Sequence, residues 1–357
     1  MKSIHTWLLL AITVCVLLSP LSALPKAADD KNAAAAAATL QNNANEQDPD
    51  RDDDAKAKDI NEATDSAKQA TASKKADTAV NLKKVTTVRL QNATTKKVEK
   101  LPISDYIYGV VAGECPMSYA DEALKAQIVA AHTYTLHCIG QNKDRDYDLS
   151  TDPQTSQNYV DKKTAFSRWG KNATAYDQRL KKLISAVGTE VITYKGAPIL
   201  AVYHAISAGK TETSKNVWGH AYSYLQSVNS VGDKLSSGYL STVKLSYEEV
   251  TEKLSGVSAT AEQIATGKID RSDAGNVLKI TSGKNVFSGG VVAQALGLRS
   301  QNFDMAIKNK EITFTVRGYG HQCGMSQNGA NFMANEGCDY KTILKHYYSG
   351  VTLENYS

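Results

Sequence analysis

The feature that most constrains the fold is a change of composition near residue 80. From Lys26 to Val80 the chain consists mainly of Ala, Asp, Lys, Asn, Gln and Thr, with almost no aromatic or branched apolar residue. Such a segment buries too little apolar surface to offset the entropy lost when it is ordered. We therefore expect residues 26–80 to be a disordered linker, and the packed core to lie within residues 81–357.

The N-terminus carries an uncharged apolar segment that runs from Trp7 to Leu24 and follows Lys2. Its length suits a short membrane span. A cleaved signal peptide would end near Ser22 and Ala23, whereas an uncleaved segment would anchor the chain. We favour the second alternative, so residues 1–25 are predicted to be a signal anchor that holds the rest of the chain outside the cytoplasm.

The charge of the folded part limits its partners. From residue 81 onward there are 32 Lys and Arg against 25 Asp and Glu. A mildly basic surface suits anionic cell-wall polymers or acidic lipid headgroups. No aromatic and basic motif of a nucleic-acid module is present, so we expect no nucleic-acid partner.

Hydrophobic periodicity predicts a mixture of helices and strands. A hairpin is expected over 83–102, then a helix that starts at Ser104 or Asp105 and ends by the glycines at 109–113. A capping-box pattern at Ser118 and Asp121 predicts a buried helix over about 119–138. Further predicted elements are a helix over 175–188, two strands joined at 195–196, a helix among Gly/Ser-rich loops within 227–296, a strand ending near 320 and a helix over 327–335. The fold class is α+β: a single mixed α/β domain, with or without a smaller inserted lobe.

Three polar clusters interrupt the apolar surroundings. They are Glu114, the segment YHAISAGKTE at 203–212 and the segment RGYGHQCGMSQNGA at 317–330. Each lies where regular elements are expected to meet, which is where binding groups tend to be held. The candidate site residues are Glu114, Tyr203, His204, Ser207, His321 and Gln327. The glycine spacing after 317 does not match a dinucleotide fingerprint.

Other interpretations of these clusters compete with a glycan-cutting site. Ser207, His204 and Glu212 could form a hydrolase triad, although Ser207 lacks a nucleophile elbow. Glu114 could instead be a structural carboxylate at the N-terminus of the helix after Ser118. Residue chemistry alone leaves the role of Glu114 open.

A metal site is the third alternative. It would have to combine dispersed residues, because no helix carries an H-x-x-x-H pair. The candidate ligands are His132, His204, His321 and Glu114. We expect these histidines to be structural or substrate-binding, and we predict no metal and no cofactor.

Seven motifs, in order, resemble the stage II sporulation protein D family. They are LPISDYIYGVVAGECP, EALKAQIVAAHTYTL, VYHAISAGKTE, NVWG, LRSQNFDM, GYGHQCGMSQNGA and ILKHYYSGV, and they extend from Leu101 to Val351. The resemblance implies a membrane-anchored lytic transglycosylase that cuts glycan strands lacking stem peptides during forespore engulfment. It also implies two partners, an amidase/endopeptidase and a multispanning membrane protein, and a place in the septal or engulfing membrane.

By this resemblance Glu114 takes the position of the family's catalytic glutamate. A lytic transglycosylase can use one carboxyl as acid and then as base while the C6 hydroxyl of the sugar attacks C1, so a second carboxylate is not needed. Tyr203, His204, Ser207, His321 and Gln327 would bind the N-acetyl groups of the sugar or stabilise developing charge. A noncatalytic glycan-binding module that activates an amidase is the alternative, because amidase enhancers share this domain.

The chain departs from its relatives at cysteine positions. Ser150 and Ser156 stand where some clostridial relatives carry two zinc-binding cysteines, and serine is a poor zinc ligand, so we predict no such site. Cys115 and Cys323 both lie in motifs expected to line the cleft. They are either two free thiols, which we favour, or a disulfide beside Glu114.

Overall fold

The computed structural model describes residues 81–356. The predicted signal anchor at 1–25 and linker at 26–80 lie outside the described residues. Within 81–356, no helix has both the length and the apolar character that a membrane span requires. The described chain is a mixture of helices and several small sheets, which confirms the α+β class.

The first elements form the predicted hairpin. Strands β1 (Thr87–Gln91) and β2 (Val98–Pro102) pair antiparallel with Thr87 opposite Pro102. The short strand β3 (Leu149–Ser150) joins the other edge of β1 in parallel. A single-turn helix, η1 (Leu82–Lys84), precedes the sheet.

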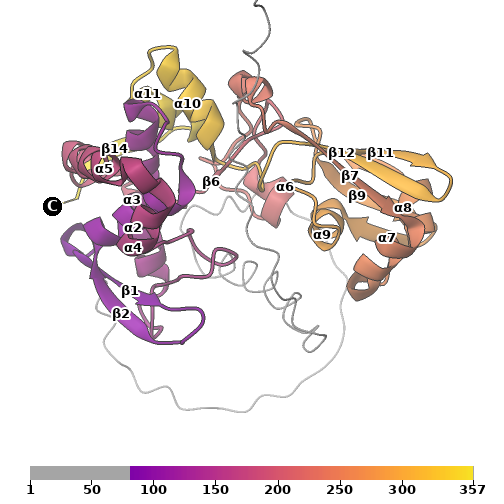
Figure 1. The fold of residues 1–357 in the computed structure, drawn as a ribbon, viewed down its shortest axis with the longest axis horizontal. Helices are drawn as coiled ribbons and strands as arrows, with labels where there is room; N and C mark the ends of the chain where they lie inside the picture. Colours follow the sequence, from indigo (N-terminus) through magenta and orange to yellow (C-terminus); the bar gives the residue numbers. More distant parts are fainter. Residues whose placement is uncertain (1–80, 357) are drawn as a thin grey trace, which may run out of the picture.

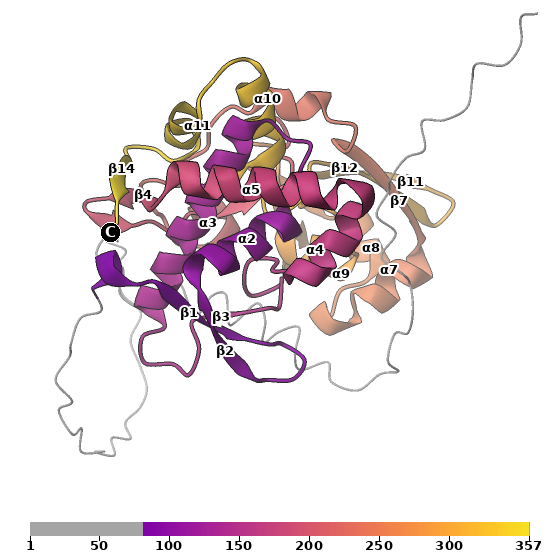
Figure 2. The same cartoon turned by 60° about the vertical axis from the view of Figure 1, so that its left-hand side comes forward.

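Helix α3 (Asp121–Gln141) is the centre of the larger core. Twelve of its 21 residues are buried, and residues 126–131 are buried without interruption. Ala126, Ala130 and Ala131 allow its neighbours to approach closely. Helices α2 (Ile103–Glu114), α4 (Lys162–Trp169) and α5 (Ala173–Val187) lie around it, with α5 crossing in front of α2 and α3 in Figure 2.

Two helix boundaries differ from the sequence prediction. Helix α2 continues through Gly109 and Gly113 and includes Glu114 as its last residue. Ser118 does not cap α3; the N-cap position is Ala120, and its N–H donates to Asn331 Oδ1 at 2.9 Å. A side chain from α10 (Gln327–Asn335) thus replaces the expected local cap.

The rest of the larger core combines elements from the middle of the chain with elements from its C-terminal part. Strand β4 (Glu190–Tyr194) lies between β5 (Ala197–Pro198) and β14 (Thr352–Asn355), and the turn at 195–196 is where it was predicted. Helix α11 (Tyr340–Tyr347) packs on α3, as does α10. Strand β6 (Tyr203–His204) pairs in parallel with β13 (Met325–Ser326).

Between β6 and β13 the chain builds a smaller lobe with its own hydrophobic core, to the right in Figure 1. Much of this segment was predicted to be one helix among loops, and that prediction was incomplete, because the segment also forms strands. Two three-stranded sheets, in the orders β11-β12-β7 and β10-β9-β8, pack with three helices. The elements are β7 (Leu240–Ser246), α7 (Tyr247–Lys253), α8 (Ala261–Thr266), β8 (Lys268–Arg271), β9 (Val277–Ser282), β10 (Asn285–Ser288), α9 (Gly289–Ala295), β11 (Phe303–Lys308) and β12 (Glu311–Arg317).

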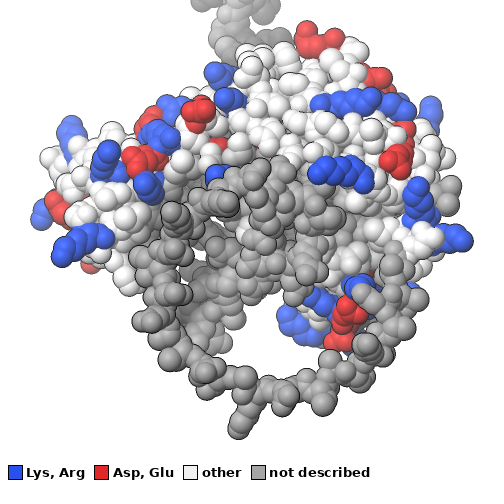
Figure 3. All heavy atoms as spheres, turned by 180° about the vertical axis from the view of Figure 1, so that it is seen from behind, with Lys and Arg blue, Asp and Glu red and all other residues white. Residues whose placement is uncertain are grey.

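Four short helices complete the described elements. Helix α6 (Ser214–Trp218) and the 3-10 helix η3 (Val231–Leu235) follow β6, while η2 (Gly170–Asn172) and η4 (Ser255–Val257) follow α4 and α7. Figure 3 shows Lys and Arg interspersed with Asp and Glu over the described surface of the rear face. The described part of that face therefore carries no broad region of a single charge sign.

Candidate active site

Two glycines on one face of α2 position the segment that contacts Glu114. A Cβ atom on Gly109 would lie 2.5 Å from Val160 O, and one on Gly113 would lie 2.3 Å from Asn158 O. Residues 157–160 therefore run directly against the helix backbone, where only glycine leaves space. The Gly109 and Gly113 positions, expected to end the helix, are packing contacts within it.

Glu114 occupies the C-terminal end of α2 and is partly buried. Its Oε1 accepts a hydrogen bond from the backbone N–H of Asn158 at 2.7 Å, while Asn158 Nδ2 donates to Gly113 O at 2.8 Å. Glu114 thus lies at a helix C-terminus, which disfavours negative charge, and the N–H group that it accepts from belongs to Asn158 and not to the helix after Ser118.

Burial raises the pKa of Glu114 above its ordinary value. The hydrogen bonds from Asn158 and the Gln327 side chain act in the opposite direction and are smaller than the effect of desolvation. The protonated form of Glu114 therefore persists to a higher pH than it would in an exposed glutamate. The amides, in turn, remain available to stabilise the carboxylate once its proton has left.

A hydrogen-bonded cluster beside Glu114 holds Tyr203. The Tyr203 hydroxyl donates to Gln157 Oε1 at 2.8 Å, and Gln157 Nε2 donates to Thr135 Oγ1 at 3.2 Å. Burial, followed by the charge of Glu114, raises the pKa of Tyr203 well above its ordinary value. Tyr203 is thus a neutral, partly exposed phenol close to the glutamate.

Gln327 begins α10 and links Glu114 to α3. Its Nε2 donates to Gln127 Oε1 at 3.3 Å, and its side chain also hydrogen-bonds Glu114. Gln127 is buried, and within 81–356 its Nε2 has no hydrogen-bond partner. Gln127 therefore holds the amide that faces the glutamate.

The pairing of β6 with β13 brings the second and third polar clusters together. His204 Nδ1 lies 3.0 Å from Cys323 O, and the N–H of Cys323 donates to His321 Nδ1 at 3.1 Å. The ring centroids of His204 and His321 are 5.7 Å apart, and the ring centroid of Trp218 lies 5.1 Å from that of His321. Burial lowers the pKa of His204 to about 3 and that of His321 to about 4, so both rings are neutral at pH 7.

Ser207 has a different setting from the one predicted. Its hydroxyl donates to Asp233 Oδ2 at 2.5 Å, and Ser326 Oγ donates to Asp233 Oδ1 at 2.7 Å. All three side chains are buried. Ser207 is therefore part of a clamp between β6, η3 and β13, and its contacts do not include Glu114.

The hydrolase triad is inconsistent with these contacts. Glu212 accepts hydrogen bonds from Asn216 at 2.9 Å and from Ser272 at 2.5 Å, so it does not orient His204. Ser207 is bound to Asp233 rather than to an imidazole. Glu212 instead ties the larger core to the smaller lobe, on which Ser272 lies.

The described residues contain no group of three or more His, Cys, Asp or Glu side chains arranged to hold a metal ion. The N–H of Ser150 donates to Ser156 Oγ at 3.0 Å, so these two positions close a loop through a hydrogen bond. Cys115 and Cys323 are both free thiols in the structure.

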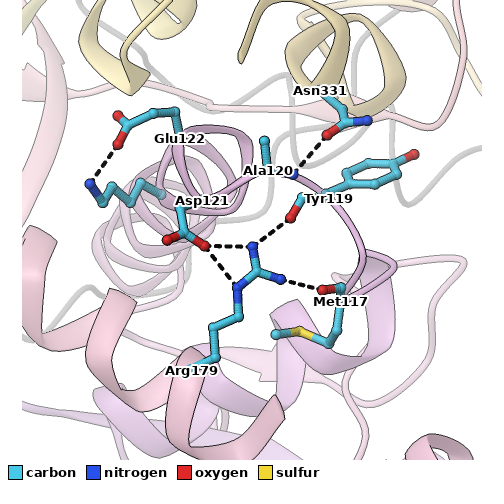
Figure 4. A network of polar contacts seen from close by, with 8 residues as sticks. Met117, Tyr119, Ala120, Asp121, Glu122, Arg179 and Asn331 are labelled. Atoms are coloured by element: carbon cyan, nitrogen blue, oxygen red, sulfur yellow. Dashed lines mark hydrogen bonds and ion pairs between the residues drawn. The ribbon is translucent and has the colours of Figure 1, made fainter. Parts of the chain in front are cut away.

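A clamp centred on Arg179 fixes the loop between Glu114 and α3 (Figure 4). The guanidinium donates to Met117 O, to Tyr119 O at 2.7 Å and to Asp121 Oδ1 at 2.5 Å. Arginine suits this task because its planar fork presents several donors in fixed directions. The loop that follows the glutamate is therefore held from α5.

Sequence reasoning missed several residues of the site. Contacts between segments far apart in the sequence bring Asn158, Gln157 and Gln127 to the site. Asp233 is identified only by its hydrogen bond with Ser207. The side chain of Trp218, in the motif NVWG, borders His321. Tyr203 and Gln327 lie close to Glu114, while His204 and His321 lie beside Cys323. The roles of these four residues and of Ser207 toward a substrate stay predictions.

Known proteins provide an independent comparison. Residues 91–194 match the family described as SpoIID, stage II sporulation protein. Stage II sporulation protein D of Bacillus amyloliquefaciens is 38% identical over 274 residues, covering 74% of this chain and 78% of that protein. The protein of the same name from Bacillus subtilis is 35% identical over 306 residues, covering 83% of this chain and 88% of that protein.

A more distant relative carries a different name. The amidase enhancer of Bacillus subtilis is 29% identical over 301 residues, which covers 70% of this chain and 40% of that protein. The two stage II sporulation proteins D match at an identity and coverage that establish common ancestry. This chain belongs to the stage II sporulation protein D family of sporulation proteins.

Proposed function

We propose that this chain is a peptidoglycan lytic transglycosylase that cuts the MurNAc–GlcNAc bond of glycan strands lacking stem peptides. The observation that carries the proposal is Glu114, a partly buried carboxyl with a raised pKa whose hydrogen bonds come from amides. A glycosidase with two acidic groups would place a second carboxyl within about 10 Å to act as nucleophile or base. The amide surroundings of Glu114 favour a reaction that needs one carboxyl.

The reaction uses Glu114 twice. Protonated Glu114 gives its proton to the glycosidic oxygen as the bond from C1 of MurNAc to that oxygen breaks, which releases the GlcNAc hydroxyl. The resulting carboxylate takes the proton of the C6 hydroxyl, and the C6 oxygen forms a new bond to C1. Glu114 is protonated again at the end, and the product carries a 1,6-anhydro-MurNAc end.

The neighbours of Glu114 have complementary tasks in this proposal. Asn158 N–H and the Gln327 amide stabilise the carboxylate between the two proton transfers. Tyr203, held by Gln157, and His321, next to Trp218, line the approach and offer polar groups to the N-acetyl substituents. The neutral imidazoles add no positive charge that would lower the pKa of the acid.

The proposal includes the cellular setting that residues 1–80 suggest. The N-terminal apolar segment anchors the chain, and the linker lets the folded part reach the wall from the septal or engulfing membrane during sporulation. The partners are an amidase/endopeptidase, which removes stem peptides and so supplies the substrate, and a multispanning membrane protein. Crosslinking in sporulating cells, with the anchor deleted as the control, tests this arrangement.

Product analysis tests the chemistry. Stem-peptide-free glycan strands are incubated with the full chain, as wild type or as Glu114→Gln, and the released ends are identified by mass spectrometry. Anhydro-muramyl ends made by wild type alone are the expected result. Reducing ends would instead indicate a hydrolase with an additional acid, and would overturn the one-carboxyl mechanism.

A noncatalytic module that activates an amidase is the second candidate, favoured by the similarity to the amidase enhancer. The Glu114→Gln variant separates the two. An activator keeps its effect on the amidase when Glu114 is neutralised, whereas a transglycosylase keeps glycan binding and loses turnover. If neither wild type nor Glu114→Gln cleaves the strands and both activate the amidase, the activator function replaces the first proposal.

A further inference from the structure

A basic pocket lies where the smaller lobe meets the larger core. Its volume is about 360 Å³, and the core contributes Ala208 and Lys234 to its lining. The lobe contributes Arg271, Asp304 and Arg317, together with Gly275 and Asn302. Three cations and one carboxylate line it, which leaves an excess of positive charge facing the cavity.

The donors of the pocket are only partly used. Asp304 accepts from Arg317 Nη2 at 2.6 Å and from Arg271 Nη2 at 3.0 Å, so one carboxylate serves two guanidinium groups. Within the described chain, the Lys234 ammonium has no ion-pair partner, and the Arg317 guanidinium forms its ion pair with Asp304 alone. The remaining N–H groups are suited to a second carboxylate.

The stem of Lys234 lies against Gly209 at the edge of the pocket. A Cβ atom on Gly209 would lie 2.2 Å from Lys234 Cε, so the lysine stem crosses the glycine in van der Waals contact. Gly209 also has a φ of +97°, a conformation that other residues rarely adopt. Lys234 is an exposed side chain whose stem passes over Gly209 at the edge of the pocket.

A short series of bonded and hydrogen-bonded residues links the pocket to the candidate site. Gln327, which hydrogen-bonds Glu114, follows Ser326, and Ser326 Oγ donates to Asp233 Oδ1 at 2.7 Å. Asp233 directly precedes Lys234 in η3. A single hydrogen bond and two peptide links thus connect the residue that touches the glutamate with the cation of the pocket.

We propose that this inter-lobe pocket binds a carboxylate of the glycan strand itself, the lactyl carboxylate that MurNAc exposes when its stem peptide is absent. The inference rests on the proposed function, because it assigns a specificity site to the same substrate. In an intact strand the lactyl group is an amide, which has no negative charge and continues into a peptide. Lys234 and Arg317 therefore meet a carboxylate on the sugar itself only where the stem peptide is absent.

A binding measurement tests this pocket without relying on turnover. The full chain carrying Glu114→Gln is titrated against end-labelled stem-peptide-free strands, and against the same strands with their carboxylates converted to methylamides. Tighter binding of the acidic strands by about tenfold is expected, because each charge-assisted hydrogen bond is worth about 1.5–3 kcal/mol. Added salt should reduce the difference.

Variants localise the effect. Lys234→Gln in the same background should remove most of the preference for acidic strands and leave binding of amidated strands unchanged, while Lys234→Arg should restore it. Lys308→Gln, at an exposed lobe lysine outside the pocket, is the matched control. Circular dichroism of each variant checks that the fold is retained.

The outcomes distinguish this inference from the proposed function. Equal affinity for acidic and amidated strands would overturn the pocket assignment, even if wild type makes anhydro ends. Poly(glycerol phosphate) is added as a competitor of strand binding. If it competes with wild-type Lys234 but not with Lys234→Gln, and the two glycans bind equally, the ligand of the pocket is a phosphate polymer and not the glycan carboxylate. A preference for acidic strands lost in Lys234→Gln would support the pocket even if no cleavage occurred.

Discussion

The backbone N–H of Asn158 donates to Glu114 Oε1 at 2.7 Å, so the candidate acid receives its main polar contact from the segment that packs on its own helix. Burial stabilises the neutral carboxyl, and this hydrogen bond stabilises the carboxylate. In the proposed reaction the group is an acid in one step and a base in the next, so its protonated and ionised forms must be close in free energy. The opposed effects on Glu114 provide that balance.

The Gly113→Ala substitution should displace the Asn158 segment, because the added Cβ would lie 2.3 Å from the Asn158 carbonyl oxygen. We expect a loss of about 1–3 kcal/mol in the free energy of unfolding, from overpacking against backbone that has no alternative position. Release of anhydro-muramyl ends should fall further, because the hydrogen bond to Glu114 moves. Gly256→Ala is the control, since a Cβ there meets nothing within 4 Å; equal effects of the two variants would contradict the packing argument.

Glu114→Gln should stabilise the protein at high pH. The folded state raises the pKa of Glu114, so it binds the proton more tightly than the unfolded chain does. The stability of wild type therefore declines as pH rises through that pKa, whereas Gln has no charge to bury. Urea unfolding at pH 4 and pH 8 should show the advantage of Gln growing with pH. Glu336→Gln, at an exposed glutamate after α10, provides the comparison, and an advantage that shrinks with pH would refute the raised pKa.

Gln327→Met should move the alkaline limb of the pH–rate profile to higher pH. The Gln327 amide lowers the pKa of Glu114, so its removal leaves the desolvation of the carboxyl less opposed. The maximal rate should also fall, because the carboxylate formed after the first proton transfer loses a donor. Gln294→Met, at an exposed position of α9, should leave the profile unchanged. A shift toward lower pH would show that Gln327 does not act on the acid.

Arg179→Lys should loosen the loop that follows Glu114. A lysine ammonium cannot reproduce the fork that reaches Met117, Tyr119 and Asp121 together. We expect the rate of anhydro-end formation to fall by about tenfold or more, since small displacements of a reacting group are costly. Arg168→Lys, at an exposed arginine of α4, is the control. Unchanged turnover in Arg179→Lys would show that Glu114 is positioned without the clamp.

Several helices and strands could be predicted from the sequence because short-range patterns determine them. The hairpin of β1 and β2, the buried α3 helix and the α10 boundaries followed from alternation, periodicity and turn residues. The end of α2 was missed because glycine is both a helix terminator and a packing residue, and only the segment at 157–160 decides between these roles. In the smaller lobe, β12 was predicted, whereas the other strands were missed because Gly/Ser-rich connections obscure their short alternating runs.

The site itself was predicted in part. Glu114 and the two clusters on β6 and β13 stood out as polar residues in apolar surroundings. The contacts of Ser207 with Asp233, and of Glu114 with Asn158, join segments that no sequence period relates. Such pairings depend on tertiary packing, so a single sequence contains no signal for them.

The pairing of β6 with β13 has a consequence for how the protein is made. Gln127 and Gln327 are separated by 200 residues, and the whole smaller lobe is synthesised between them. A chain emerging from the ribosome or crossing a membrane thus presents Glu114 long before the amide from α10 can reach it. The hydrogen bond between Gln327 and Glu114 therefore forms only after α10 has been made, and a copy truncated before α10 keeps Glu114 without it.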